Sequence, residues 1–68
     1  MSEYRISRAY DPAIDGEMLR ISMANARGHE FFKRVPFPGA REYKRVRDEA
    51  LDAIEAAIAR GDDPGEVA

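Results

Sequence analysis

One stretch of the chain, residues 28–45, carries most of the side chains that could bind a partner. It holds three phenylalanines, one tyrosine and five basic residues. Cations neutralise phosphates, and aromatic rings stack on bases or fill pockets. Arginine and aromatic residues are also the usual anchors of protein interfaces. We therefore expect the partner-binding residues to be Phe31, Phe32, Lys33, Arg34, Phe37, Arg41, Lys44 and Arg45.

The same stretch could instead serve the hydrophobic core. A chain this small needs large apolar side chains, so at least one of Phe31, Phe32 and Phe37 is expected to be buried. Basic residues weigh against a purely structural role for this region. Four cations, one of them just beyond the stretch, fall in the first two turns of a predicted helix, where the helix dipole favours acids. These cations indicate a negative partner or a carboxylate of the same chain, and they are Arg41, Lys44, Arg45 and Arg47.

Catalytic and metal-binding patterns are scarce. His29-Glu30 is half of a zinc-helix signature whose second histidine is absent, and the chain has no cysteine for a thiolate nucleophile or a zinc site. Asp48, Asp52 and Glu55 share one helix face at i, i+4 and i+7, and we interpret them as a solvated outer face. We predict a non-enzymatic protein with no cofactor and no metal site.

Three elements are expected before residue 40. Residues 4–10 alternate as a strand does. Residues 12–27 have a helix entry at Asp11-Pro12, an apolar helical spacing and a closing glycine, although Asp15-Gly16 could also turn a hairpin. The likeness of residues 24–28 to residues 57–61 favours the helix. Residues 29–38 form an extended arm, because the two prolines disfavour both a helix and a central strand.

The clearest element is a helix over residues 40–60. Its apolar stripe recurs at helical spacing, Gly61 ends it and Pro64 prevents its continuation. Residues 62–68 are expected to form a frayed acidic tail. The sequence therefore predicts a small α+β domain over residues 1–61, with an N-terminal strand, a short helix, an extended Phe/Pro arm and a long C-terminal amphipathic helix.

Size and charge limit the class of protein. Sixty-eight residues with no cysteine form one small core, which favours oligomerisation or docking into an assembly. The net charge of −2 hides a basic first part, residues 1–47, and an acidic second part, residues 48–68. The N-terminus has no apolar signal region and no run is long enough to span a membrane, so we expect a cytoplasmic protein without a membrane partner.

Two classes of function follow from these features. The first is a small interaction protein (an adaptor, inhibitor or assembly subunit) that docks on a protein partner or on itself through its aromatic and basic segment. The second is a nucleic-acid-binding regulator, since the predicted strand-helix-helix order resembles that of ribbon-helix-helix DNA-binding dimers in order alone. An acidic mimic of nucleic acid, using residues 48–66, is a further alternative.

Overall fold

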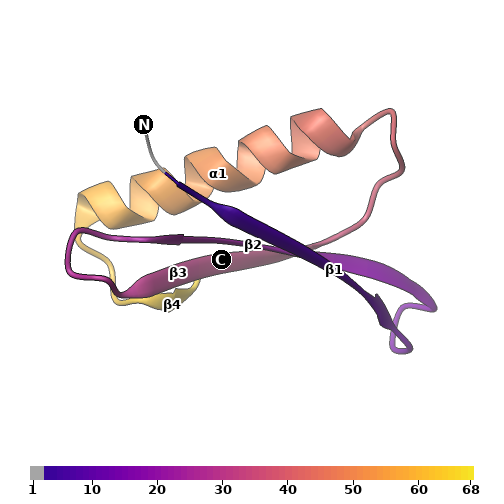
Figure 1. Cartoon of the computed structure of the whole chain (residues 1–68), viewed down its shortest axis with the longest axis horizontal. Helices are drawn as coiled ribbons and strands as arrows, with labels where there is room; N and C mark the ends of the chain where they lie inside the picture. The colour runs from indigo at the N-terminus through magenta and orange to yellow at the C-terminus, as the bar shows by residue number, and fades with distance from the viewer. Residues whose placement is uncertain (1–2) are drawn as a thin grey trace.

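The computed structural model describes residues 3–68, which form a four-stranded sheet with one helix packed across it (Figure 1). The strands lie in the order β1-β2-β3-β4, antiparallel from β1 to β3 and parallel between β3 and β4. The elements are β1 (Arg5–Asp11), β2 (Gly16–Ala24), β3 (Glu30–Pro36), α1 (Tyr43–Arg60) and β4 (Gly65–Glu66). The predicted fold class is therefore wrong, because the chain has a four-stranded mixed sheet and one helix instead of one strand and two helices.

The helix predicted over residues 12–27 is wrong, because these residues form the turn and the second strand of a β-hairpin. Asp11 Oδ1 accepts a hydrogen bond from the Ala13 N–H at 2.9 Å, and the Asp11 carbonyl accepts one from the Ile14 N–H at 3.3 Å. These contacts begin a tight turn as readily as they begin a helix. Asp15 then adopts a left-handed φ of 48°, which reverses the chain into β2. The Asp-Pro signal was thus a turn signal.

The likeness between residues 24–28 and 57–61 has a different cause from a shared helix end. Gly28 has a φ of 83° in the β2–β3 loop, and Gly61 has a φ of 75° after α1. Both places need the left-handed region, which glycine enters without a steric penalty. At the helix end, the Gly61 N–H donates to the Ile58 carbonyl and the Asp62 N–H to the Ala57 carbonyl. The same requirement for a left-handed backbone therefore explains the glycine in the hairpin loop and the glycine at the helix end.

The predicted extended arm, residues 29–38, is in fact largely a central strand. β3 pairs with β2 on one side and with the short β4 on the other. Pro36 is its last residue, and β4 lies opposite only Phe31 and Phe32. A proline is tolerated there because its nitrogen faces the edge that β4 does not reach. The prediction of an extended arm was wrong because Pro36 occupies the last position of the strand and Pro38 lies beyond it.

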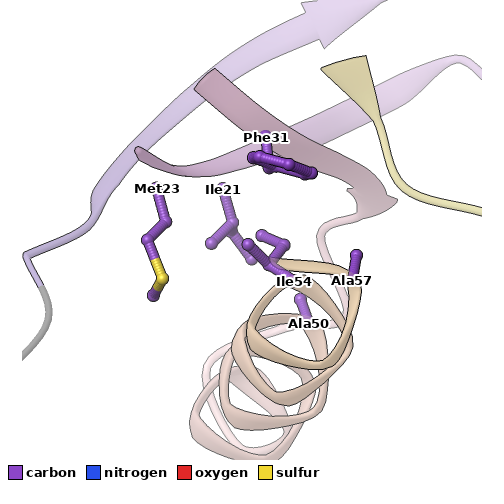
Figure 2. Packing of buried hydrophobic residues seen from close by; sticks show 6 residues of the cluster. All are labelled: Ile21, Met23, Phe31, Ala50, Ile54 and Ala57. Atoms are coloured by element: carbon purple, nitrogen blue, oxygen red, sulfur yellow. The ribbon is translucent and has the colours of Figure 1, made fainter. Parts of the chain in front are cut away.

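The hydrophobic core lies between the sheet and α1 (Figure 2). Side chains from β2 and β3 point towards the helix, where Ile54 is fully buried at their centre. Two alanines let the helix approach the sheet closely. The buried cluster is Ile21, Met23, Phe31, Ala50, Ile54 and Ala57. One of the three phenylalanines is thus core, as expected, and α1 lies within the predicted 40–60.

The C-terminal residues are tied to the sheet rather than frayed. The Val67 N–H donates to the Phe32 carbonyl at 2.7 Å, and Val67 packs against the core. Glu66 forms a two-pronged ion pair with Arg34, at 2.9 and 3.0 Å. This ending therefore protects part of the outer edge of β3.

Candidate interaction surface

The predicted partner-binding residues lie on different parts of the molecule. Phe31 is 2% exposed in the core, so it is unavailable to a partner. Phe32 lies on the opposite face of β3, which faces away from α1. Phe37 and Arg41 lie in the segment between β3 and α1. Lys33 and Arg34 lie on β3, and Lys44 and Arg45 lie in the first turn of α1. The expected single surface is thus divided by the pleat of β3.

Phe37 takes part in a groove beside β1. The groove has a volume of about 430 Å³ and lies between β1, Leu19 of β2 and the segment leading into α1, including Phe37, Ala40 and Tyr43. Its floor is apolar, because Leu19 is 1% exposed and Ile6 packs against the core. We call this hollow the β1 groove. It is a concave and largely apolar hollow beside the outer strand of the sheet.

Cations and aromatic rings alternate along the wall of the β1 groove. The Arg8 guanidinium lies 3.8 Å from the centre of the Phe37 ring, and the Phe37 and Tyr43 ring centres are 6.2 Å apart. The Arg47 guanidinium lies 5.8 Å from the Tyr43 ring centre. Such contacts orient the rings without filling the hollow between them. The wall therefore carries two aromatic rings, each with an arginine side chain over one of its faces.

Arg8 also has a carboxylate partner. Its Nε and one terminal nitrogen donate to the two carboxylate oxygens of Glu17, at 2.5 and 2.7 Å. This hydrogen bonding raises the pKa of Arg8 and lowers the pKa of Glu17. Arg8 interrupts the helix-side face that Ile6 and Tyr10 share on β1, and the ion pair with Glu17 explains how this face tolerates a cation. The rim of the groove is thus charged but neutral overall.

The hydrogen-bond pattern of β2 fixes which way its backbone groups point. The Asn25 N–H donates to the His29 carbonyl at 3.0 Å, and the Phe37 N–H donates to the Glu17 carbonyl at 2.8 Å. Hydrogen-bonded and non-hydrogen-bonded pairs alternate in an antiparallel ladder. The odd-numbered residues of β2 consequently bond to β3, and its even-numbered residues bond to β1.

The same alternation then determines the outer edge of β1. Even-numbered residues of β2 lie opposite odd-numbered residues of β1, as Arg20 lies opposite Ser7. The odd-numbered residues of β1 therefore bond to β2, and the N–H and C=O groups of Ile6, Arg8 and Tyr10 point outwards. Among residues 3–68, no strand pairs with this edge. Sequence reasoning missed the edge because the hairpin that creates it was assigned to a helix.

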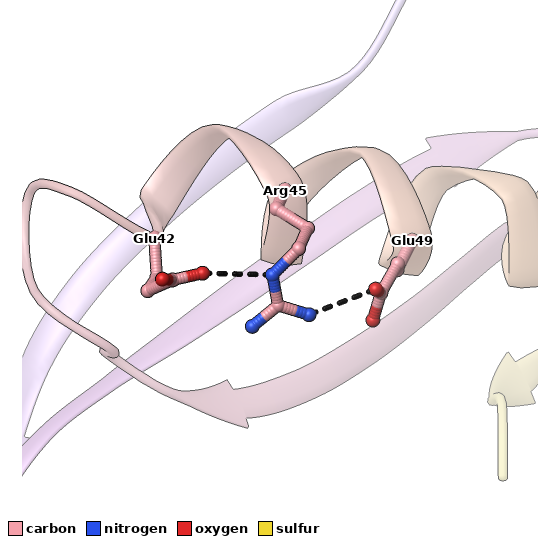
Figure 3. Close-up of polar contacts among 3 residues, drawn as sticks. All are labelled: Glu42, Arg45 and Glu49. Carbon is pink, nitrogen blue, oxygen red and sulfur yellow. Dashed lines mark hydrogen bonds and ion pairs between the residues drawn. The ribbon is translucent and has the colours of Figure 1, made fainter.

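The basic start of α1 is partly neutralised within the chain. Arg45 donates to Glu42 at 2.8 Å and to Glu49 at 2.9 Å, and its side chain bridges two turns of the helix (Figure 3). Hydrogen bonds to these carboxylates raise the pKa of Arg45. Within residues 3–68, Arg41 and Lys44 take part in no ion pair. The cations at this end thus meet carboxylates of the same chain in part, which the sequence left open.

The face of the sheet away from α1 is polar and balanced in charge. Arg20 lies over the Phe32 ring, 4.2 Å from its centre, and donates to Glu30 at 2.7 Å. Arg34 is paired with Glu66. These bonds lower the pKa of Glu30 and of Glu66. The carboxylates paired with Arg20 and Arg34 make this face a poor match for a phosphate backbone.

Neither a metal-binding group of side chains nor a membrane-spanning helix occurs among the described residues. Residues 3–68 contain no group of three or more His, Cys, Asp or Glu side chains placed to hold a metal ion. Over the same range, no helix is long and apolar enough to cross a bilayer. The comparisons give no further guide, since no family model, curated protein or solved structure matches the chain significantly.

Proposed function

We propose that this protein is a non-enzymatic interaction module that binds an extended protein segment along the outer edge of β1. The observation that carries the proposal is the outward-pointing backbone of Ile6, Arg8 and Tyr10 beside the β1 groove. An extended segment that adds to a sheet edge gains main-chain hydrogen bonds, while pockets beside the edge select its side chains. Phe37 and Tyr43 of the predicted segment supply that pocket.

Two further features support docking at this edge. Tyr10 is 62% exposed and Tyr4 is 43% exposed, and both lie on or beside β1. Large exposed aromatic residues are typical anchors of interfaces. The edge is regular along its length, since β1 contains no proline and its registered pairing with β2 runs unbroken from Arg5 to Asp11.

Nucleic acid is the second candidate partner, and Phe32 under Arg20 is the observation that favours it. A ring flanked by a cation can stack a base. The neighbouring Glu30 and Glu66 would repel phosphates, and binding would have to break two ion pairs. A protein partner at β1 requires neither change, so it is the function we prefer.

The test compares two substitutions at one position. Tyr10→Pro removes an outward N–H and keeps the bonds between β1 and β2, whereas Tyr10→Thr loses the same side chain and keeps the N–H. Each form is used to capture proteins from the native source, with and without nuclease. We expect a nuclease-resistant partner that Tyr10→Thr binds more weakly than wild type, because the ring is lost, and that Tyr10→Pro no longer binds.

Phe32→Ala serves as the control on the opposite face. If Tyr10→Pro binds as wild type while Phe32→Ala loses the partner, the docking surface is the outer sheet face and the proposal is wrong. If the captured material disappears with nuclease treatment, the partner class is nucleic acid. Far-UV circular dichroism of each variant verifies that the sheet and the helix are intact.

A further inference from the structure

The free edge of β1 is complementary to itself. We propose that its partner is β1 of a second copy, paired antiparallel about Arg8, so that two sheets join into one. This rests on the proposed function, because it identifies the extended segment that the edge binds. Arg5 and Asp11 lie at opposite ends of β1 and on the same face of the sheet. Two-fold pairing centred on Arg8 places Arg5 of each copy opposite Asp11 of the other copy, so the interface contains two such pairs.

Charge favours this register over its neighbours. In residues 3–68, neither Arg5 nor Asp11 takes part in an ion pair. Since both are odd-numbered, they fall on the closely spaced, non-hydrogen-bonded pairs, where side chains approach most closely. Pairing centred on Ser7 would instead place Arg5 opposite Ala9. Neither Arg5 nor Asp11 would then lie opposite a residue of the other charge. Pairing about Arg8 thus gives Arg5 and Asp11 the ion-pair partners that they lack within residues 3–68 of one chain.

The helix-side face of the same pairing is apolar at both ends. Ile6 comes opposite Tyr10 of the second copy, again twice, and Ile6 forms part of the β1 groove. The exposed Tyr10 ring of each copy therefore lies beside Ile6 in the groove of the other. The central pair sets Arg8 against Arg8, and each is already neutralised by its own Glu17. The outward groups of Ile6, Arg8 and Tyr10 then bond across the interface.

The exposed area of the chain is consistent with a missing neighbour. The chain exposes 4951 Å². A compact monomer of 7.7 kDa exposes about 4,300 Å² on the usual scaling. The excess, about 600 Å², approaches the roughly 800 Å² that each partner buries in a standard interface. The radius of gyration, 12.2 Å, also exceeds the roughly 10.9 Å expected for this length.

Charge reversal tests the register directly, with molar mass measured by sedimentation over a range of concentrations. Wild type is expected to approach twice the monomer mass. Arg5→Asp alone and Asp11→Arg alone set like charges opposite each other twice, and each should weaken association by about tenfold or more. An equal mixture of the two variants restores both opposite-charge pairs, so it should associate as wild type does.

Two controls keep the test decisive. Asp11→Asn replaces the carboxylate oxygen that accepts the Ala13 N–H hydrogen bond with an amide oxygen that can also accept it. This variant therefore separates the charge of Asp11 from its role in the turn. Tyr10→Pro should be monomeric, whereas Tyr10→Thr should associate more weakly than wild type but still form the dimer. Monomeric wild type at every concentration, or a mixture that stays monomeric, overturns the self-pairing. If Tyr10→Pro nevertheless loses a different captured protein selectively, the proposed function stands without it.

Discussion

Phe31 and Phe32 are neighbours in sequence and lie on opposite faces of β3, and their truncation should have very different effects. Phe31 is 2% exposed and packs in the core cluster. Phe32 is half-buried on the outer face beneath Arg20. Because the two side chains are identical, the comparison isolates the surroundings of each ring.

The expected magnitudes follow from that placement. Phe31→Ala removes a fully buried ring and leaves a cavity, which costs about 3–5 kcal/mol of unfolding free energy. Phe32→Ala loses partial burial and one cation–π contact, which together cost about 1–2 kcal/mol. A domain of this length has a total stability of about 3–10 kcal/mol. Phe31→Ala should therefore unfold much of the protein, and Phe32→Ala should leave it folded.

Urea unfolding followed by far-UV circular dichroism measures both values, since the chain has no tryptophan to follow. The thermal midpoint gives an independent check, because 1 kcal/mol corresponds to about 4–8 °C for a domain of this size. Equal losses for the two variants, or a larger loss for Phe32→Ala, would refute the assignment of faces on β3.

Three other perturbations test the account. Hydrogen bonds from arginine side chains lower the pKa of three carboxyl groups, those of Glu17, Glu30 and Glu66. These ion pairs therefore stabilise the fold above about pH 4.3, and the stabilisation is lost as the pH falls through the folded-state pKa values. The urea midpoint should fall in acid, and it should fall less steeply in Arg8→Gln. Gly61→Ala forces alanine to a φ of 75° and should cost about 1 kcal/mol, whereas Gly16→Ala meets only ordinary contacts and should change stability by a few tenths, both measured by urea unfolding. Arg45→Gln removes both helix ion pairs, and its effect on the thermal midpoint should shrink at high salt; an effect independent of salt would contradict the electrostatic origin.

Patterns that depend on regular repetition were predictable from the sequence. The seven-residue alternation of β1 and the apolar stripe of α1 identified both elements, because the periods of two and 3.6 residues are distinct over these lengths. Residues 12–27 were ambiguous because Leu19, Ile21 and Met23 fit a strand while Asp11-Pro12 fits a helix entry. Sheet pairing decided between them, since Met23 meets Phe31 across β2 and β3.

The candidate site was less predictable than the elements. Phe37 and Tyr43 were singled out by residue type, and both line the β1 groove. Phe31 has the same type and is core, because the pleat of β3 alternates its residues between the two faces. The free edge of β1 depends on the order of strands, and strand order depends on long-range pairing that no local pattern contains.

Amide hydrogen exchange along β1 tests the central claim most directly. In protein diluted until sedimentation shows it to be monomeric, the amides of Ile6, Arg8 and Tyr10 should exchange fast, while those of Ser7 and Ala9 should be protected by their bonds to β2. Concentrating the protein, or adding the captured partner, should protect the first set and leave the second unchanged. If the first set is already protected in dilute protein, or stays unprotected when the partner is bound, the edge of β1 is not the docking surface.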